Sequence, residues 1–133
     1  MFKFANWSLL RLALAADAAA SGAMGILLAA AAEPLTAWFG LPLPLLRAVG
    51  LLLIPYAAVL VYLATRATTL RLPAQLIVAG NVLWVVGSGA LLVSGLVAPT
   101  PLGTAFVIAQ ALIVAILAEL QVMGLKRQRL ATA

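Results

Sequence analysis

The sequence predicts an all-α fold, a four-helix transmembrane bundle with antiparallel neighbours, and its composition is the first reason. Of the 133 residues, 66% are hydrophobic and 8% are charged, whereas a water-soluble domain of this length needs about a quarter of its residues charged. The mean hydropathy is +1.22. The second reason is an uncharged stretch from Leu72 to Ala118, which is more than twice the roughly 20 residues that one membrane helix needs. We therefore expect residues 1–133 to form a single transmembrane domain.

The predicted spans are four apolar segments separated by proline-containing or charged connections. They cover residues 9–32, 44–65, 73–96 and 101–125. Pro44, Pro73 and Pro101 mark helix starts, because the missing N–H of proline has no intrahelical partner in a first turn. Thr100 is the expected N-cap of the fourth span. Pro55 lies inside the second span and should kink it.

The connections between the spans are short, so consecutive helices are expected to pack as antiparallel neighbours. One connection, residues 33–43, is longer and contains Trp38 and Phe39 among polar and turn residues. Aromatic residues concentrate at the boundary between membrane and water. This connection is therefore expected to lie at the headgroup level, and Phe4 and Trp7 should do the same on the opposite side.

Basic residues predict the orientation of the chain. Seven of the eight fall at the N-terminal end, in the middle loop or in the C-terminal tail, on one predicted side of the membrane: Lys3, Arg11, Arg66, Arg71, Lys126, Arg127 and Arg129. Arg47 alone is on the other side, where it would reach outward or meet Glu33. The positive-inside rule then places both termini in the cytoplasm. The net charge of +5 is explained by this asymmetry and does not indicate nucleic-acid binding. The first span is expected to be retained rather than cleaved as a signal peptide, because it is long and Asp17 interrupts it.

Small residues recur along two of the spans, at spacings that place them on one helix face. The pairs are Ala15/Ala19, Ala18/Gly22 and Ser21/Gly25 in the first span and the series Gly80, Gly87 and Ser94 in the third. Helices in lipid associate through close backbone packing and interhelical hydrogen bonds. The first and third spans are therefore expected to turn these faces to the bundle interior. The alternative is an interface with another protein or a second copy of the chain.

Two carboxylates lie within the spans. Asp17 is about 12 Å into the first helix and Glu119 about 9 Å from the end of the fourth, at 1.5 Å per residue, and Ser21 follows Asp17 by one turn. Intramembrane carboxylates are costly and usually face the interior or a partner. One hypothesis is a proton or cation relay, or a site for a cationic substrate. The alternative is an ion pair with a basic residue near the interface, the candidates being Arg11, Arg66 and Lys126.

Asn81 and Gln110 are the amides expected inside the bundle. Both are interpreted as interhelical hydrogen-bonding groups, with the lining of a ligand cavity as the alternative. Together with Asp17, Ser21 and Glu119 they make up the candidate intramembrane polar site. Trp84 and Tyr56 are interpreted as packing residues. The sequence has neither cysteine nor histidine, which excludes disulfide exchange, the usual zinc ligand sets and His-activated nucleophiles. No cofactor, metal or catalytic residue is therefore predicted.

Several stretches of the chain resemble a family of small four-span bacterial membrane proteins that has no established activity. They are LLRLALAADAAASGAMGILL (9–28), GLPLPLLRAVGLLLIPYA (40–57), NVLWVVGSGALL (81–92) and APTPLGTAFVIAQALIVAILAELQVMGL (98–125), which together cover most of the chain. The resemblance implies the four-span fold and a multi-pass location in a bacterial cytoplasmic (inner) membrane, and it carries no mechanism. The chain is also similar in size to small multidrug resistance transporters, and Asp17 is similar in kind to the carboxylate of their first helix. That family has Glu at this place, and its aromatic partners have no counterparts at matching positions.

These features favour a non-enzymatic membrane protein, an accessory or assembly partner of a larger complex. The alternative is a small homodimeric transporter coupled to protons or cations through Asp17 and Glu119. An intramembrane enzyme acting on lipid is the least favoured hypothesis, because two acids without histidine or a recognisable motif give little acid–base chemistry.

Overall fold

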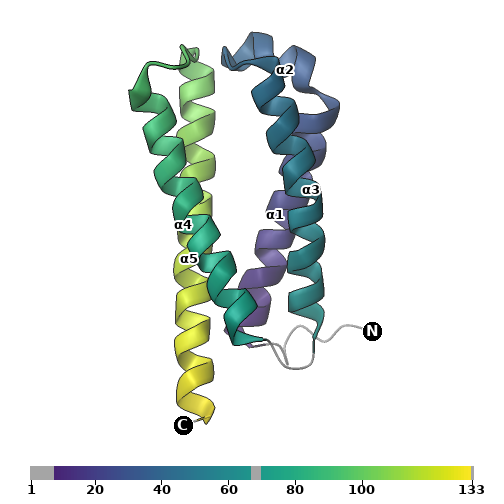
Figure 1. The fold of residues 1–133 in the computed structure, drawn as a ribbon, viewed down its shortest axis with the longest axis vertical. Coiled ribbons are helices and arrows are strands. Elements are labelled where there is room, and N and C mark those ends of the chain that lie inside the picture. Colours follow the sequence, from purple (N-terminus) through teal and green to yellow (C-terminus); the bar gives the residue numbers. More distant parts are fainter. Residues whose placement is uncertain (1–7, 67–69, 133) are drawn as a thin grey trace.

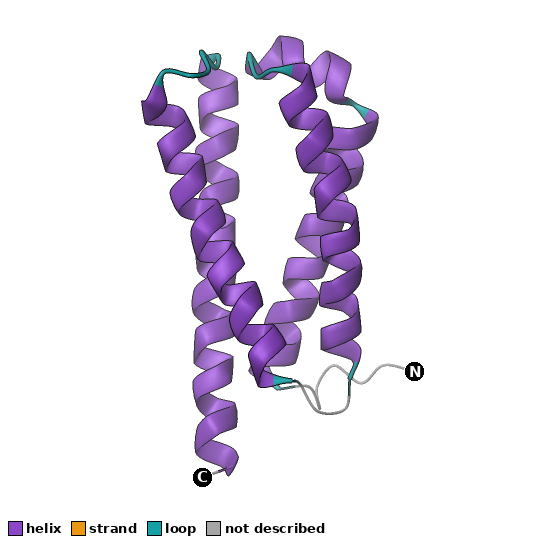
Figure 2. Cartoon of the chain, viewed as in Figure 1, coloured by secondary structure: helices purple, strands orange, loops and turns teal. Residues whose placement is uncertain are grey.

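The computed structural model describes residues 8–66 and 70–132, and over these residues the chain forms five helices and no strand (Figures 1 and 2). Within this part of the chain, four helices are long and apolar enough to cross a membrane. They are α1 (Leu9–Ala30), α3 (Leu43–Thr65), α4 (Arg71–Ser94) and α5 (Pro101–Thr132). The all-α prediction is confirmed, and the chain has the make-up of a multi-pass membrane protein. Phe4, Trp7 and Lys3 lie outside the described residues.

Two helix boundaries differ clearly from the predicted spans. The connection at residues 33–43 contains a short helix, α2 (Ala32–Phe39), which ends at Gly40 with a left-handed φ of 67°. Helix α5 continues to Thr132, past the predicted end at residue 125. Residues 126–130 of this extension are Lys, Arg, Gln and Leu, which are all good helix formers, so the helix continues beyond its apolar part.

The predicted signals hold at the starts of α3 and α5, whereas α4 begins at Arg71, two residues before Pro73. The Gly103 N–H donates to Thr100 Oγ1 at 3.0 Å, which confirms Thr100 as the N-cap of α5. The Thr100 hydroxyl in turn donates to the backbone oxygen of Trp38 at 2.6 Å, so the start of α5 is tied to the end of α2. Arg47 and Glu33, near the same end of the molecule, approach to 4.0 Å as an exposed ion pair.

The long helices form two pairs. Helix α1 packs along α3, α4 packs along α5, and α1 also contacts α5. Figure 1 shows the two pairs diverging toward the end of the molecule at which α2 lies, here called the α2 end. Helices α3 and α4 are consecutive in the chain, yet their described residues do not pack along one another. Their contact is limited to side chains, among them Leu60 of α3 and Ala74 of α4 in one buried cluster, so the packing of consecutive spans as antiparallel neighbours stays a prediction for this pair.

Glycines explain which helices approach closely. A Cβ atom added at Gly50 of α3 would lie 2.5 Å from the backbone nitrogen of Ala29 in α1, and one added at Gly124 of α5 would lie 2.6 Å from the backbone of Leu10 in α1. Backbone contacts of this kind hold membrane helices together. On α4, by contrast, a Cβ at Gly80 or Gly87 would meet nothing within 4 Å. Of the small residues predicted on α1, Gly25 is packed, since a Cβ there would lie 3.0 Å from the backbone oxygen of Gly50, whereas Ala19 is exposed; the small-residue face of α4 is not packed.

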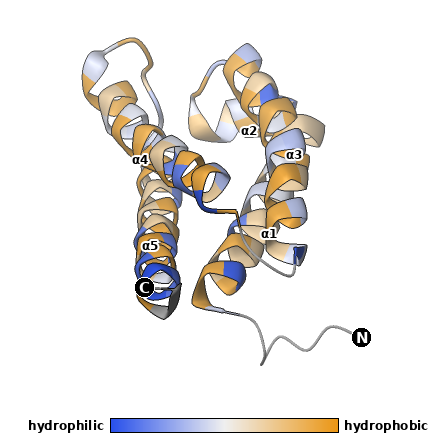
Figure 3. Cartoon of the chain, turned by 60° about the horizontal axis from the view of Figure 1, so that its bottom comes forward, coloured by the Kyte–Doolittle hydropathy of each residue, from blue (hydrophilic) through white to orange (hydrophobic). Residues whose placement is uncertain are grey.

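Buried apolar side chains gather at both ends of the molecule. One cluster centres on Leu14, Leu60 and Leu125 near the start of α4, and the other on Leu28 and Phe39 at the α2 end. The Phe39 ring stacks on Phe106 of α5 with centroids 4.4 Å apart. Figure 3 shows the hydrophilic residues concentrated where α4 begins and α5 ends. The two helix pairs are thus joined by apolar contacts at both ends.

Candidate functional site

The carboxyl group of Asp17 lies at the centre of a buried polar network. Asp17 is 2% exposed. Its Oδ2 accepts hydrogen bonds from Asn81 Nδ2 of α4 at 2.8 Å and from Gln121 Nε2 of α5 at 2.9 Å. Its Oδ1 accepts from the Ser21 hydroxyl, one turn later on α1, at 3.1 Å. Asp17 therefore holds α1 to both α4 and α5.

Asn81 extends this network to α3. It donates to Gln121 Oε1 at 3.0 Å and accepts from the Tyr56 hydroxyl at 2.8 Å. We refer to Asp17, Ser21, Tyr56, Asn81 and Gln121 as the Asp17 node. Each of the helices α1, α3, α4 and α5 contributes at least one member. The node is thus the level at which the two helix pairs are joined by hydrogen bonds.

The donors around Asp17 are neutral. Among the described residues no salt bridge joins a cation to it, and two of the three basic residues predicted as candidates have a hydrogen-bond partner elsewhere. Arg11 Nε donates to the backbone oxygen of Ala64 at 2.8 Å, and Arg66 donates to the Tyr62 hydroxyl. Hydrogen bonds to a charged group contribute about 1.5–3 kcal/mol each. Donors from two amides and a hydroxyl can therefore offset most of the cost of burying this carboxyl group.

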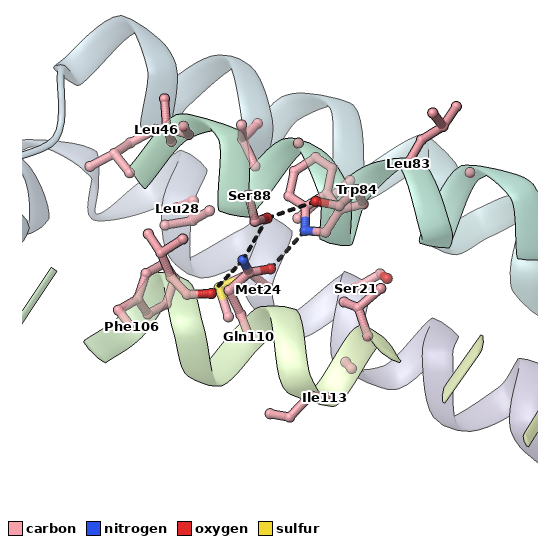
Figure 4. Close-up of a pocket in the computed structure, with 18 of the residues that line it drawn as sticks. Ser21, Met24, Leu28, Leu46, Leu83, Trp84, Ser88, Phe106, Gln110 and Ile113 are labelled. Carbon is pink, nitrogen blue, oxygen red and sulfur yellow. Dashed lines mark hydrogen bonds between the residues drawn. The ribbon is translucent and has the colours of Figure 1, made fainter. Parts of the chain in front are cut away.

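A second polar cluster lies nearer the α2 end and is here called the Gln110 cluster (Trp84, Ser88 and Gln110; Figure 4). The Trp84 indole N–H donates to Gln110 Oε1 at 2.7 Å. Gln110 Nε2 donates to Ser88 Oγ at 3.0 Å and to the Val107 backbone oxygen at 2.8 Å. The Ser88 hydroxyl donates to the Trp84 backbone oxygen at 2.8 Å. The cluster joins α4 to α5 at a position about 10 Å along α4 from Asn81, at 1.5 Å per residue.

A cavity of about 520 Å³ lies between the two helix pairs and connects the two polar clusters. Asp17 and Ser21 line it at one end, the Gln110 cluster lines its wall, and the remaining lining is apolar. The apolar side chains come from all the long helices and include Met24, Leu28, Leu46, Val49, Phe106 and Ile113. Several of these surround the Gln110 cluster in Figure 4.

The cavity is not fully enclosed, and part of its lining on α4 is exposed. Helices α3 and α4 do not pack along one another, yet Leu53 of α3 and Leu83 of α4 both line the cavity, and Leu83 is 71% exposed. Gly80 and Gly87 of α4 also line it, and their missing side chains leave the wall open. In a membrane, this exposed part of the lining faces the hydrocarbon of the lipid.

The structure brings together some of the residues predicted for the polar site. Asp17, Ser21 and Asn81 are directly hydrogen-bonded in the Asp17 node, and Gln110 lies on the same cavity. Glu119 is not part of this arrangement.

Glu119 is exposed, and no hydrogen bond or ion pair joins it to another described residue. It is two positions from Leu117 and two from Gln121, both of which are buried. Because two residues turn a helix by about 200°, Glu119 points away from the bundle.

Two members of the Asp17 node were not among the predicted site residues. Gln121 is 0% exposed, and its distance of 11 residues from Gln110, about three helical turns, places both amides on one face of α5. That spacing is visible in the sequence and could have identified it. Tyr56 was interpreted as a packing residue, but a buried tyrosine hydroxyl usually needs a hydrogen-bond partner.

The polar groups at the site are one carboxyl group, amides, hydroxyls and an indole N–H. Over the described residues, no group of three or more His, Cys, Asp or Glu side chains is placed to hold a metal ion. No protein-family model matches the chain, and no curated protein or solved structure matches it either. The fold and the site define a helical membrane protein with an internal cavity that has polar groups at two levels.

Proposed function

We propose that this protein is a non-enzymatic membrane protein that binds a lipid-soluble, amphipathic molecule in the cavity between its two helix pairs. The cavity itself carries the proposal. Small-molecule sites are concave, mostly apolar, and have a few placed polar groups within roughly 300–1,000 Å³. The cavity between the pairs has about 520 Å³, an apolar wall, and polar groups at two levels. Such a space open to lipid favours an apolar occupant, because an unfilled wall loses its van der Waals contacts.

The proposal includes the placement of the chain in a bacterial inner membrane, with both termini in the cytoplasm and neighbouring helices antiparallel. The distribution of basic residues supports this orientation, since Arg71, Lys126 and Arg127 fall at the same end of the bundle and Arg47 at the other. The cavity then extends from the depth of Asp17 toward the outer leaflet.

The test of ligand binding uses two glycines of α4. A Cβ at either Gly87 or Gly89 meets nothing within 4 Å, so a side chain can start at both positions without a clash. Only Gly87 lines the cavity. We expect Gly87→Leu to fill part of the cavity and to remove a bound molecule that native mass spectrometry detects after gentle extraction. The matched variant Gly89→Leu should retain that molecule.

The outcome depends on the difference between the two variants. If wild type and Gly87→Leu carry the same bound molecules in the same amounts, the cavity is not a binding site. If both variants lose the molecule, its loss does not come from filling the cavity, and the proposal is equally wrong.

A role as an accessory or assembly partner of a larger membrane complex is a second candidate, which Glu119 favours. This carboxylate lies within an apolar helix, is exposed, and has no partner among the described residues. Exposed carboxylates within a span are costly, and a donor or cation on a second membrane protein would offset that cost. We expect Glu119→Gln to reduce co-purification of such a partner while leaving the bundle intact. Unchanged co-purifying chains in native mass spectrometry would speak against this role.

A homodimeric transporter coupled to protons or cations is the alternative, and its coupling site no longer includes Glu119. Asp17 lies on the cavity, whereas Glu119 points away from it, so coupling would depend on Asp17 without Glu119. This alternative predicts that Asp17→Asn abolishes ion-coupled uptake into proteoliposomes and that Glu119→Gln does not. Equal loss in both variants would contradict it.

A further inference from the structure

The polar groups that line the cavity have a shared property: their hydrogens are already in use. The lining side chains that carry N–H or O–H groups are Ser21, Trp84, Ser88 and Gln110. The hydroxyl of Ser21 donates to Asp17, and that of Ser88 donates to the Trp84 backbone. The Trp84 indole donates to Gln110. Both hydrogens of the Gln110 amide are committed, one to Ser88 and one to Val107. These groups therefore have no hydrogen left for a ligand.

Several acceptors on the same wall are only partly used. Each carbonyl or carboxyl oxygen can accept two hydrogen bonds. Asp17 Oδ1 accepts from Ser21, Gln110 Oε1 accepts from Trp84, and each has a second lone pair. Ser21 Oγ also keeps its acceptor capacity, because it acts as a donor to Asp17. No lysine or arginine lines this cavity within the described part of the chain. The cavity thus offers acceptors without donors.

We propose that the cavity selects an amphiphile with one apolar chain and a hydrogen-bond-donating head, an amine or a hydroxyl, and excludes carboxylate and phosphate heads. This inference rests on the proposed function, and it specifies the ligand class. The head would lie at Asp17 and Ser21, because a carboxyl oxygen is the strongest acceptor on the wall. The chain would extend along Leu28, Leu46 and Phe106 toward the α2 end.

Acidic heads are rejected because the cavity lining has acceptors but no free donors. A carboxylate or phosphate has only acceptors to offer once it is ionised, so its oxygens would face Asp17 and Gln110 Oε1 without a donor between them. In hydrocarbon no water is present to satisfy such groups, and a buried polar group without a partner is costly. An amine or hydroxyl head can instead donate its hydrogens to the oxygens that still have an unused lone pair.

Four probes with the same chain test the selection: dodecylamine, dodecanol, dodecanoate and dodecyl phosphate. Each is added to the purified full-length protein in lipid nanodiscs, and bound stoichiometry is read by native mass spectrometry against concentration. We expect dodecylamine and dodecanol to bind, and dodecylamine to bind at least about tenfold more tightly than either acid. Gly87→Leu should abolish binding of both, and Gly89→Leu should not.

Two variants locate the head. Asp17→Asn keeps an oxygen for Asn81 and Gln121 but places an N–H₂ group where Asp17 Oδ1 has its unused lone pair, so the advantage of the amine over the alcohol should disappear. Ser21→Ala removes one acceptor for both heads but also frees Asp17 Oδ1 of its internal donor, so the advantage of the amine over the alcohol should increase. Circular dichroism checks that both variants stay helical. A purely structural Asp17 would leave the ratio of amine to alcohol affinity unchanged in both, which would overturn the inference.

The failures of the two proposals can be told apart. If dodecanoate or dodecyl phosphate binds as well as dodecylamine, and Gly87→Leu blocks all of them, the cavity is a binding site but the selection for donors is wrong. If no probe binds in a manner sensitive to Gly87→Leu, the proposed function itself is wrong.

Discussion

Replacement of Asn81 by leucine tests whether the Asp17 node holds the two helix pairs together. Asn81 is 4% exposed, and leucine has nearly the same shape without hydrogen-bonding atoms. The change removes the bonds to Asp17 and Gln121 and the bond from the Tyr56 hydroxyl. It leaves Asp17 with Gln121 and Ser21 as donors.

The expected loss in the free energy of unfolding is about 2 kcal/mol. Side-chain hydrogen bonds between membrane helices average about 0.6 kcal/mol each, and three are lost. The value rises toward roughly 3 kcal/mol if Gln121 Oε1 is left without a donor, because an unsatisfied buried polar atom costs about 1–3 kcal/mol. The greater hydrophobicity of leucine contributes little, since the separated helices are also in the membrane.

The assay is reversible unfolding in mixed micelles by increasing amounts of a denaturing detergent, followed by circular dichroism and tryptophan fluorescence. Gln75→Leu is the matched control, because it makes the same exchange of amide for leucine on an exposed position of α4. Its effect should stay within about 0.5 kcal/mol. The double variant with Gln121→Leu should cost less than the sum of the single changes by about 0.5 kcal/mol or more, because the two amides share a hydrogen bond.

Equal changes in stability for Asn81→Leu and Gln75→Leu would show that the Asp17 node does not hold the two helix pairs together. Additive effects of Asn81→Leu and Gln121→Leu would likewise show that the hydrogen bonds of the node do not couple α4 to α5.

Two further predictions concern packing and the second polar cluster. Gly50→Ala should destabilise the bundle by about 1–3 kcal/mol through overpacking, because the added Cβ would lie 2.5 Å from the neighbouring backbone. Gly80→Ala, in open space, should be neutral or stabilise α4 by up to about 1 kcal/mol. Thermal unfolding in detergent measures both, and equal melting temperatures would contradict the packing described for α1 and α3. Gln110→Leu should leave the Trp84 indole N–H without its acceptor, lowering stability by roughly 1–3 kcal/mol and shifting the tryptophan emission to shorter wavelength. An emission spectrum that is unchanged would argue against this hydrogen bond.

The sequence by itself determined the number and approximate limits of the long helices. Apolar length and composition are sufficient for this, because a helix in lipid satisfies its own backbone hydrogen bonds whatever its neighbours are. The N-cap at Thr100 was predictable for the same reason, since the hydroxyl and the N–H that it accepts from are three residues apart. The continuation of α5 through Lys126 was missed because the apolar pattern ends there, although the residues that follow favour a helix.

Only the tertiary structure decided which polar groups meet. The sequence predicts a similar depth in the membrane for Asp17 and Glu119. In the structure Asp17 faces Asn81 and Gln121, whereas Glu119 faces away from the bundle. Depth follows from position along a helix, but rotation about the helix axis depends on contacts with the neighbours. Those contacts are backbone approaches at points such as Gly50 and Gly124.

The cavity also depends on contacts between neighbouring helices. Short connections predict that α3 and α4 are neighbours, whereas α3 makes its closest backbone approach to α1, at Gly25 and Gly50. The space that results could not be read from any single helix, because it is a property of how two helix pairs diverge. Helix formation is local and was predictable from the sequence, whereas the cavity and the Asp17 node arise from contacts between residues far apart in the chain.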